Sequence, residues 1–232
     1  MNKGPFIAIA GNIGVGKTTF TKLLAERMNL IPYYESVDDN PYLSDFYSNM
    51  ERWSFNLQIY FLQHRFMHHI EINNLNKGVI QDRTIYEDAS IFAYNLYEMK
   101  IMSKRDWETY ISLFDNMTQF LKKPDLIIYL KASTDTLINR IKSRSRDYEK
   151  DIDKGYLHRL NIYYKNYKKW FSRNLPTSEL SPSSSTQRNQ SSQPITSFFF
   201  PEPLETNCIP NSVKAVTLFS ETFPFSPGGS FS

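Results

Sequence analysis

Two hydrophobic patterns alternate along the first 171 residues of the chain. Continuous apolar runs, which are typical of strands buried on both faces, occur at residues 6–10 and 126–130. A short strand is also predicted over residues 79–81, and a short extended run covers residues 30–34. Between these runs, apolar residues recur at intervals of three and four, which predicts amphipathic helices. The predicted helices cover residues 19–28, 42–49, 51–75, 86–99, 104–120, 134–142 and 153–171. This alternation predicts an α/β fold with a parallel sheet flanked by helices.

The first apolar run leads directly into a glycine-rich loop. Its sequence fits G-x-x-x-x-G-K-[ST], the P-loop, in which glycines let several backbone N–H groups point at an anion. A chance glycine-rich turn is the alternative, but the strand before the loop and the helix after it favour a P-loop three-layer fold that binds a nucleoside triphosphate. Lys17 is expected on the β- and γ-phosphates and the Thr18 hydroxyl on Mg²⁺. The residues expected to contact the triphosphate are Gly11, Asn12, Ile13, Gly14, Val15, Gly16, Lys17, Thr18 and Thr19.

Composition narrows the class of protein. The 232 residues are enough for one domain of ordinary size, and a net charge of only +3 argues against a dedicated nucleic-acid binder. No apolar stretch is long enough to span a bilayer, and the N-terminus has no signal-peptide pattern. The single cysteine, Cys208, excludes an internal disulfide and indicates a reducing compartment. We therefore expect a cytoplasmic protein whose partners are neither a membrane nor a nucleic acid.

The composition changes sharply near residue 172. Ser, Thr, Pro and Gln dominate beyond this point, and eight of the twelve prolines lie there. Segments such as 183–185 and 190–193 have no helical or strand period, which is typical of disorder. We expect residues 1–171 to form the folded domain. Residues 172–232 are expected to be a disordered tail, either a flexible extension or a segment foreign to the fold, as after a reading-frame change.

Charged residues follow two of the predicted strands. Glu35 comes after the extended run 30–34, and Asp82 and Arg83 follow the strand 79–81. Because the carboxyl ends of parallel strands meet at one edge of a sheet, where ligands bind, we expect these side chains to lie beside the P-loop. A solvated surface glutamate and a structural Asp–Arg ion pair are the alternatives.

Several separate motifs occur in order along residues 5–171. They are residues 11–18, 35–37, 40–42, 52–55, Gln58, Arg65, 82–88, 92–93 and 140–146. Together they resemble the deoxynucleoside kinases, the family that contains the deoxycytidine, deoxyguanosine and deoxyadenosine kinases. The resemblance implies that residues 1–171 form a C-terminally incomplete kinase domain. It also implies ATP-dependent phosphorylation of a deoxynucleoside 5′-hydroxyl in nucleotide salvage, with ATP and Mg²⁺ as cofactors.

The resemblance assigns catalytic roles to three residues. Glu35 matches the glutamate beside the substrate 5′-hydroxyl, where a carboxylate accepts or orients the proton. Asp82 matches an acid that either holds Mg²⁺ or serves as the proton acceptor, and the sequence does not choose between these two roles. Arg83 matches an arginine that stabilises phosphoryl charge and the attacking oxygen.

The resemblance also assigns residues to the deoxynucleoside. Gln58 offers one donor and one acceptor to the base. Arg65 follows it by two helical turns, and its pairing with Asp88 resembles a pair suited to deoxyadenosine or deoxycytidine. Tyr47 and Glu149 match residues that bind the sugar 3′-hydroxyl. The walls expected to stack on the base, which a plain core role would equally explain, are Trp53, Leu57 and Phe92. The full set expected at the substrate is Glu35, Tyr47, Gln58, Arg65, Arg83, Asp88, Phe92 and Glu149.

Three arginines near the end of a predicted helix match the lid of this family. Arg140, Arg144 and Arg146 are expected to clamp the phosphates of ATP, because the planar guanidinium fork suits phosphate oxygens. A basic helix end that merely complements the helix dipole is the alternative. The resemblance further implies a homodimer that forms through two long helices.

The C-terminal segment departs from the family pattern. The family continues into a further strand beside the P-loop strand, an adenine-contacting loop and a closing helix, and no such elements are expected from residue 175 onward. A missing strand would leave an apolar sheet edge exposed. One alternative to an active kinase is therefore a catalytically impaired nucleotide-binding or misfolded product. A second alternative is a nucleoside monophosphate kinase, which would need extra basic residues at the acceptor.

Overall fold

The computed structural model describes residues 3–35, 40–144, 149, 152–174 and 214–219 of the chain. Its strands are β1 (Phe6–Gly11), β2 (Ile31–Tyr33), β3 (Val79–Asp82), β4 (Leu126–Lys131) and β5 (Lys214–Phe219). Its helices are α1 (Lys17–Met28), α2 (Leu43–Ser48), α3 (Met50–Asn74), α4 (Ile85–Glu87), the π-helical η1 (Asp88–Ala93), α5 (Tyr94–Glu98), α6 (Lys104–Thr118), α7 (Thr134–Arg144) and α8 (Lys154–Asn174). The expected α/β architecture with a parallel sheet flanked by helices is confirmed.

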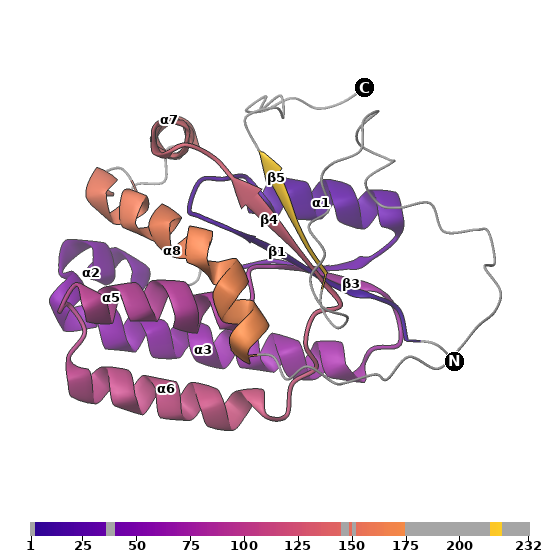
Figure 1. Ribbon diagram of the computed structural model, residues 1–232, viewed down its shortest axis with the longest axis horizontal. Helices are drawn as coiled ribbons and strands as arrows, with labels where there is room; N and C mark the ends of the chain where they lie inside the picture. The colour runs from indigo at the N-terminus through magenta and orange to yellow at the C-terminus, as the bar shows by residue number, and fades with distance from the viewer. Residues whose placement is uncertain (1–2, 36–39, 145–148, 150–151, 175–213, 220–232) are drawn as a thin grey trace.

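The described strands form a five-stranded sheet in the order β2-β3-β1-β4-β5 (Figure 1). All four pairings are parallel, and β1 lies at the centre between β3 and β4. The chain first moves from β1 toward β2 and β3 and then crosses to β4 on the other side. The carboxyl end of β1 is therefore a topological switch point, where open parallel sheets bind ligands.

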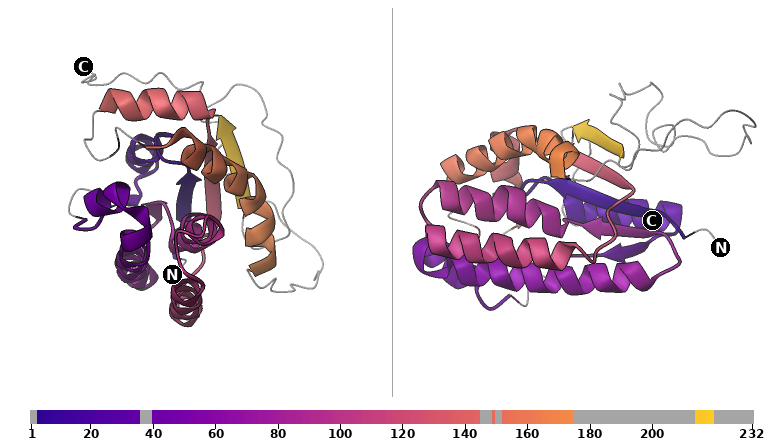
Figure 2. Two further views of the ribbon diagram at one scale, coloured as in Figure 1. Left: turned by 90° about the vertical axis from the view of Figure 1, so that its left-hand side faces the viewer. Right: turned by 60° about the horizontal axis from the view of Figure 1, so that its bottom comes forward.

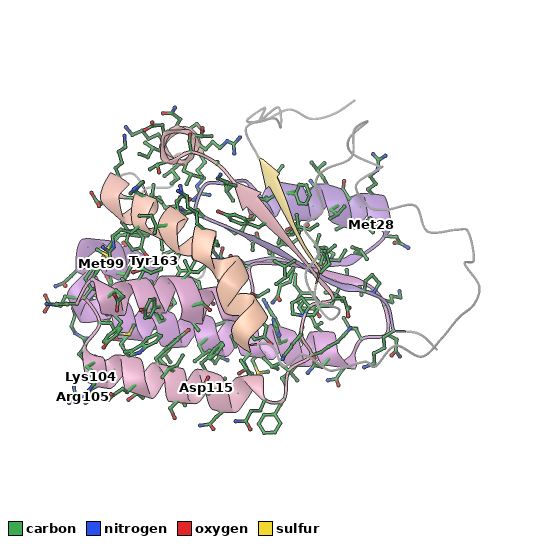
Figure 3. The ribbon with its side chains drawn as sticks, viewed as in Figure 1. Met28, Met99, Lys104, Arg105, Asp115 and Tyr163 are labelled. Carbon is green, nitrogen blue, oxygen red and sulfur yellow. The ribbon has the colours of Figure 1, made fainter. Side chains whose placement is uncertain are left out.

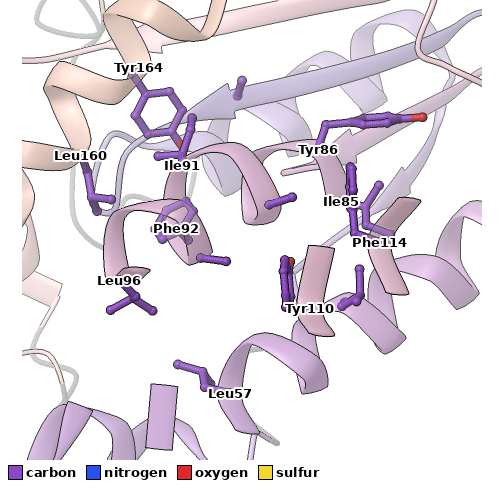
Figure 4. Packing of buried hydrophobic residues seen from close by; sticks show 14 of the residues in the cluster. Leu57, Ile85, Tyr86, Ile91, Phe92, Leu96, Tyr110, Phe114, Leu160 and Tyr164 are labelled. Carbon is purple, nitrogen blue, oxygen red and sulfur yellow. The ribbon is translucent and has the colours of Figure 1, made fainter. Parts of the chain in front are cut away.

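Helices cover both faces of this sheet (Figure 2). Helices α1 and α7 cover one face, where Ile9 of β1 packs in one cluster with Leu24 and Leu137. The other face carries α3, the η1–α5 segment and α8, and here Ala8 packs in one cluster with Leu160. Alternate residues of β1 thus serve two cores, as the period of two in a strand requires. Figure 4 shows part of the larger core, with Tyr164 of α8 near the side chains of η1.

Local capping signals set several helix starts. Ser103 and Asp106 have the sequence spacing of an N-cap and its N3 residue, and the Ser103 side chain caps α6 by accepting a hydrogen bond of 3.1 Å from the Asp106 backbone N–H. The sequence suggests Asp39 or Asn40 as the cap of α2, but the cap position is Tyr42, and Asp39 lies outside the described residues. The Asn40 side chain instead accepts a hydrogen bond of 2.9 Å from the Tyr42 N–H, just before the helix begins. Figure 3 shows the side chains of α6 that project from the molecule's outer surface.

The segment predicted as one helix over residues 86–99 has an irregular centre. Its six residues Asp88–Ala93 are π-helical, between the short α4 and α5. Apolar periodicity does not distinguish a π-helical turn from an α-helical one. Such turns occur frequently at functional sites, and here the segment places Asp88 and Phe92 at one cavity.

The expectation that no further strand follows residue 171 is wrong. β5 pairs with β4 in parallel, from Leu126 opposite Lys214 to Lys131 opposite Phe219. It therefore covers the outer edge of β4, whereas the neighbours of the P-loop strand β1 are β3 and β4. The strand includes a short, mostly apolar segment, Ala215 to Phe219. It was not predicted because the Ser- and Pro-rich sequence on either side dominates the composition of this region. Helix α8 also continues to Asn174, past the expected boundary at residue 171.

No helix in the described part of the chain is both long and apolar enough to cross a membrane.

Candidate functional site

A cavity of about 460 Å³ lies beside the P-loop, at the carboxyl ends of the strands. Residues from the P-loop, the end of β2, helices α2, α3, α7 and α8, and η1 line it. Most residues that the sequence assigned to a site meet there, although they come from distant parts of the chain. Those on the cavity wall are Ile13, Gly14, Gly16, Lys17, Thr18, Thr19, Glu35, Tyr47, Gln58, Arg83, Asp88, Phe92, Arg140, Arg144 and Glu149.

The other assigned residues lie behind the wall or outside the described residues. Gly11, Asn12 and Val15 are buried parts of the P-loop, and Arg65 and Asp82 are 4% and 1% exposed. Arg146 lies outside the described residues. Of the walls expected to stack on a base, Leu57 and Phe92 line the cavity. Trp53 is not among the lining residues; its ring lies 5.9 Å from that of Tyr42.

The P-loop follows β1 and ends where α1 begins. Gly14 and Gly16 have φ angles of 78° and 100°, in the left-handed region that favours glycine. A Cβ on Gly14 would lie 2.8 Å from Cγ1 of Ile141 and 3.0 Å from the carbonyl oxygen of Leu137. The loop therefore packs closely against α7, and Gly14 is required by both conformation and space. The N-terminus of α1 adds positive potential at this wall.

Lys17 is buried at the start of α1. Its Nζ donates a hydrogen bond of 3.1 Å to the carbonyl oxygen of Asn12. Burial, aided by the nearby Arg83, lowers the pKa of Lys17 to about 8. The ammonium form still predominates at neutral pH, so the cavity has a desolvated cation beside the loop that suits a phosphate.

Thr18 and Asp82 join the P-loop to the end of β3. The Thr18 hydroxyl donates a hydrogen bond of 2.6 Å to Oδ2 of Asp82. Oδ1 of Asp82 is buried and has no hydrogen-bond partner among the described residues. Burial raises the pKa of Asp82 above its ordinary value, although Lys17 opposes the shift. A buried carboxylate oxygen without a partner, next to a hydroxyl, fits Mg²⁺, which binds proteins through one or two oxygens and takes phosphates as further ligands.

Glu35 lies between two arginines at the cavity wall. Arg65 Nη2 donates a hydrogen bond of 2.7 Å to its Oε1, and Arg83 Nε lies 3.3 Å from the same oxygen. Burial would raise the pKa of Glu35, but Arg83, Arg65 and Lys17 outweigh it and hold the pKa well below its ordinary value. The side chain is therefore a carboxylate at neutral pH, and it can accept a hydrogen bond from a ligand in the cavity.

Arg83 adopts an unusual backbone conformation. Its φ of 64° is left-handed, which costs about 1–2 kcal/mol for a residue other than glycine. The guanidinium lies over the Phe92 ring, with Cζ 4.2 Å from the ring centroid. It also contacts Glu35, Glu87 and Tyr164. These contacts hold a strained residue in place beside the P-loop, as is common at functional sites.

A second polar group consists of Gln58 and Asp88 on the cavity wall and Arg65 behind it. Arg65 Nε donates a hydrogen bond to Oδ2 of Asp88, and the same guanidinium reaches Glu35. Burial raises the pKa of Asp88 to about 6, although Arg65 and Arg83 oppose the shift. Gln58 is 3% exposed, and its buried Oε1 has no hydrogen-bond partner among the described residues. The group combines a carboxylate with a free amide oxygen, which suits a ligand with hydrogen-bond donors.

The remaining assigned residues close the cavity from the side of α7. Arg140 Nη1 donates a hydrogen bond of 3.1 Å to the carbonyl oxygen of Val15 in the P-loop. Arg144 Nε donates one of 2.7 Å to Oε2 of Glu149. Burial raises the pKa of Tyr47 well above its ordinary value, and the neighbouring Glu149 adds to the shift. Arg140 therefore contacts the P-loop, and Arg144 contacts the side of the cavity that contains Tyr47.

Two buried residues at the site are not predicted from the sequence. Glu87 is fully buried, and its Oε2 accepts a hydrogen bond of 3.0 Å from the Gly11 N–H. Tyr164 donates a hydrogen bond of 2.8 Å to the Gly11 carbonyl oxygen. A signal for Glu87 was present, because Thr84 and Glu87 have the spacing of a capping box, and the Thr84 N–H donates a hydrogen bond of 3.2 Å to Oε1 of Glu87. Tyr164 has no such signal, since it lies among several tyrosines of α8.

Comparison with known proteins agrees with this arrangement. A family model described as deoxynucleoside kinase matches residues 7–195, a match that extends beyond residue 171. The chain is 44% identical over 167 residues to the deoxyadenosine/deoxycytidine kinase of Bacillus subtilis (strain 168), covering 71% of this chain and 77% of that protein. It is 42% identical over 193 residues to the deoxyadenosine kinase of Dictyostelium discoideum, covering 83% and 78% respectively.

A solved structure also shares the fold. It is the deoxyadenosine kinase from M. mycoides with the products dCMP and a flexible dCDP bound. The two chains superpose with a TM-score of 0.67 at 34% sequence identity, over 74% of this chain and 87% of that one.

Proposed function

Because this chain belongs to the deoxynucleoside kinase family, we propose that it transfers the γ-phosphate of ATP to the 5′-hydroxyl of a deoxynucleoside. The product is the deoxynucleoside 5′-monophosphate, made in nucleotide salvage. One observation carries this proposal: the P-loop, the Glu35–Arg83 pair and the Arg65–Asp88 pair all meet at one cavity. Its size, about 460 Å³, lies in the range of small-molecule sites.

The P-loop end of the cavity receives the triphosphate. Backbone N–H groups of the loop and the N-terminus of α1 face the phosphate oxygens. Lys17 neutralises the β- and γ-phosphates, and Arg140 and Arg144 approach from α7. Arg146 is the third proposed clamp. These groups stabilise charge that spreads over the transferred phosphoryl oxygens, which is the main catalytic demand of this reaction.

The proposed nucleophile is the 5′-hydroxyl, with Glu35 as its acceptor. Glu35 is a carboxylate that lines the cavity, so it orients the hydroxyl and takes the proton as the new P–O bond forms. Arg83 stabilises the attacking oxygen and the phosphoryl group from the same side. Asp82 lies behind the cavity wall and accepts a hydrogen bond from the Thr18 hydroxyl, so we assign it the role of metal ligand and not that of proton acceptor. Mg²⁺ held by Thr18 and Asp82 would neutralise charge on the β- and γ-phosphates.

The Arg65–Asp88 pair and Gln58 make the proposed base site. Adenine and cytosine both present an amino donor beside a ring-nitrogen acceptor, whereas guanine and thymine present a ring N–H beside a carbonyl oxygen. The carboxylate of Asp88 and the amide oxygen of Gln58 accept from an amino group, and the Gln58 amide nitrogen donates to a ring nitrogen. We therefore favour deoxyadenosine or deoxycytidine. Phe92 and Leu57 supply apolar walls, and Tyr47 and Glu149 the contacts to the 3′-hydroxyl.

The alternatives are not favoured. A nucleoside monophosphate kinase needs free basic groups for the acceptor phosphate, yet Arg65 is paired with Asp88 and Glu35, and Arg83 with Glu35 and Glu87. The alternative of an impaired or misfolded product rested on a missing C-terminal strand, and β5 supplies a strand at the outer edge of β4.

We also propose a cytoplasmic homodimer without nucleic-acid or membrane partners. Met67 on α3 and Leu113 on α6 are 47% and 42% exposed, and neighbouring Phe120 is 72% exposed. Exposed large apolar side chains on α3, on α6 and just after α6 suit contact with a second copy of the chain. Residues 1–171 remain the proposed kinase domain, and most of residues 172–232, which we expected to form a tail, lies outside the described residues. Sedimentation velocity tests the dimer, which a single monomeric species would contradict.

A product assay tests the proposed function. The protein is incubated with ATP, Mg²⁺ and each of the four deoxynucleosides in turn, and the monophosphates are separated by chromatography. We expect the highest kcat/KM with deoxyadenosine or deoxycytidine. Lack of product with all four would refute the proposal.

A further inference from the structure

One face of α8 contacts the beginning of the P-loop at three points. Asn12 Nδ2 donates hydrogen bonds of 3.0 Å to the Leu157 carbonyl oxygen and 2.9 Å to Asn161 Oδ1. The Tyr164 hydroxyl lies 2.8 Å from the carbonyl oxygen of Gly11. The three α8 positions are four and three residues apart, so they share one face of the helix. The long helix near the end of the described domain thus holds the first two residues of the loop.

The Tyr164 hydroxyl also meets two charged side chains. It accepts a hydrogen bond of 3.0 Å from Arg83 Nη1, and it lies 2.7 Å from Oε2 of Glu87. A hydroxyl has one proton, so it donates to Gly11 or to Glu87 at any moment while it accepts from Arg83. Glu87 in turn accepts from the Gly11 N–H. Gly11, Glu87, Tyr164 and Arg83 therefore form one closed polar cluster.

Packing fixes the direction of the Tyr164 ring. The ring stacks on Tyr129 with centroids 5.4 Å apart and an angle of 11°, and it meets the Phe92 ring edge-on at 6.5 Å. The residue is 1% exposed (Figure 4). Since the apolar contacts are made by the ring alone, the hydroxyl is required for the polar cluster and not for filling the core.

We infer that Tyr164 is a positioning residue that fixes Arg83 relative to the P-loop. It acts through Arg83 and Gly11, and it lines no part of the cavity. Arg83 has a strained backbone, and its guanidinium is the group proposed to stabilise the attacking oxygen. Its orientation therefore depends on contacts with residues behind the cavity wall. The Tyr164 hydroxyl supplies this support and ties it to the loop that holds the transferred phosphate. This inference rests on the proposed kinase function.

The test is Tyr164→Phe, which keeps the ring and removes the hydroxyl. We expect kcat to fall about tenfold, equivalent to about 1.4 kcal/mol in the activation barrier. KM for ATP and for the deoxynucleoside should stay within about threefold, because Gly11 remains bound to Glu87 and the support of Arg83 matters most in the transition state. The matched control is Tyr163→Phe on the same helix, whose hydroxyl lies 3.5 Å from Arg159 Nη2. It should keep the kcat of the unmodified protein.

Glu87→Gln provides a second variant, in which kcat should likewise fall while both KM values stay nearly unchanged. In the double variant the loss in kcat should be smaller than the product of the two single losses, because both act on one cluster. The inference is overturned if Tyr164→Phe matches Tyr163→Phe in kcat and loses only thermal stability, since that describes a purely structural hydroxyl. If the unmodified protein makes no monophosphate at all, the proposed function fails first and the inference falls with it.

Discussion

The hydroxyl of Thr18 donates a hydrogen bond of 2.6 Å to Oδ2 of Asp82, which joins the start of α1 to the end of β3. The two carboxylates of the site, Asp82 and Glu35, therefore differ in position. Asp82 faces the P-loop from behind, whereas Glu35 lines the cavity between Arg65 and Arg83. The proposed roles follow from this geometry, with Asp82 on the metal and Glu35 on the acceptor hydroxyl.

Replacing Asp82 with Asn should separate activity from stability. We expect kcat/KM to fall at least about a hundredfold, because the proposed metal ligand loses its charge. The melting temperature without nucleotide should instead rise by about 2–4 °C. Burial raises the pKa of Asp82 above its value in the unfolded chain, so ionised Asp82 destabilises the fold at neutral pH, and the uncharged Asn removes this cost. Asp115→Asn on the exposed surface of α6 is the control (Figure 3). Unchanged activity in Asp82→Asn would contradict the assignment.

Glu35→Gln tests the acceptor of the proton. We expect kcat to fall about 10²- to 10³-fold with little change in KM for ATP, because the amide cannot take the proton. Steady-state kinetics with varied ATP and deoxynucleoside measure both parameters. Glu26→Gln, on the exposed face of α1, serves as a control. If Glu35→Gln kept most of kcat, the proton acceptor would have to be another group.

The base site should respond to pH through Asp88. Its pKa is raised to about 6 by burial, against the opposing effect of Arg65. Protonation below this pH removes the ion pair, so kcat/KM for the deoxynucleoside should fall up to about tenfold per pH unit between pH 6 and 5. The pKa of Glu35 is held well below this window, so Glu35 stays ionised. Asp88→Asn should abolish this slope, and an equal slope in that variant would exclude Asp88 as its source.

His69 should make the fold sensitive to acid. It is 1% exposed on α3, and burial lowers its pKa to about 3, although the nearby Gln81 side chain opposes the shift. As the pH falls, His69 is therefore protonated in the unfolded chain at a higher pH than in the folded protein. The free energy of unfolding should fall by about 1.4 kcal/mol for each pH unit between pH 6 and 4. Urea unfolding of His69→Gln should lack this component. His158→Gln on the exposed face of α8 should retain it, and equal slopes in all three proteins would contradict the account.

The sequence predicts the elements that have strong local signals. The three-and-four spacing over residues 51–75 predicts α3, which covers Met50–Asn74. The P-loop motif and the strand-end rule together place Thr18 near Asp82, as the structure has them. These predictions succeed because they depend on periodicity within one segment or on the common edge of a parallel sheet.

The elements that were missed depend on contacts between distant segments. β5 is a short run in a Ser- and Pro-rich region, and its pairing with β4 joins residues 88 positions apart, from Leu126 to Lys214. Tyr163 and Tyr164 are adjacent and chemically identical, yet only the hydroxyl of Tyr164 contacts Gly11 and Arg83. No local pattern distinguishes these two tyrosines, because the difference comes from the surface against which α8 packs.

Phosphate transfer to one defined oxygen tests the central claim most directly. The protein is supplied with ATP labelled at its γ-phosphate and either deoxyadenosine, deoxycytidine or the matching analogue that lacks the 5′-hydroxyl. The account predicts labelled 5′-monophosphate from at least one of the two deoxynucleosides and none from its analogue. Label on the analogue, or no label on either deoxynucleoside, would contradict it.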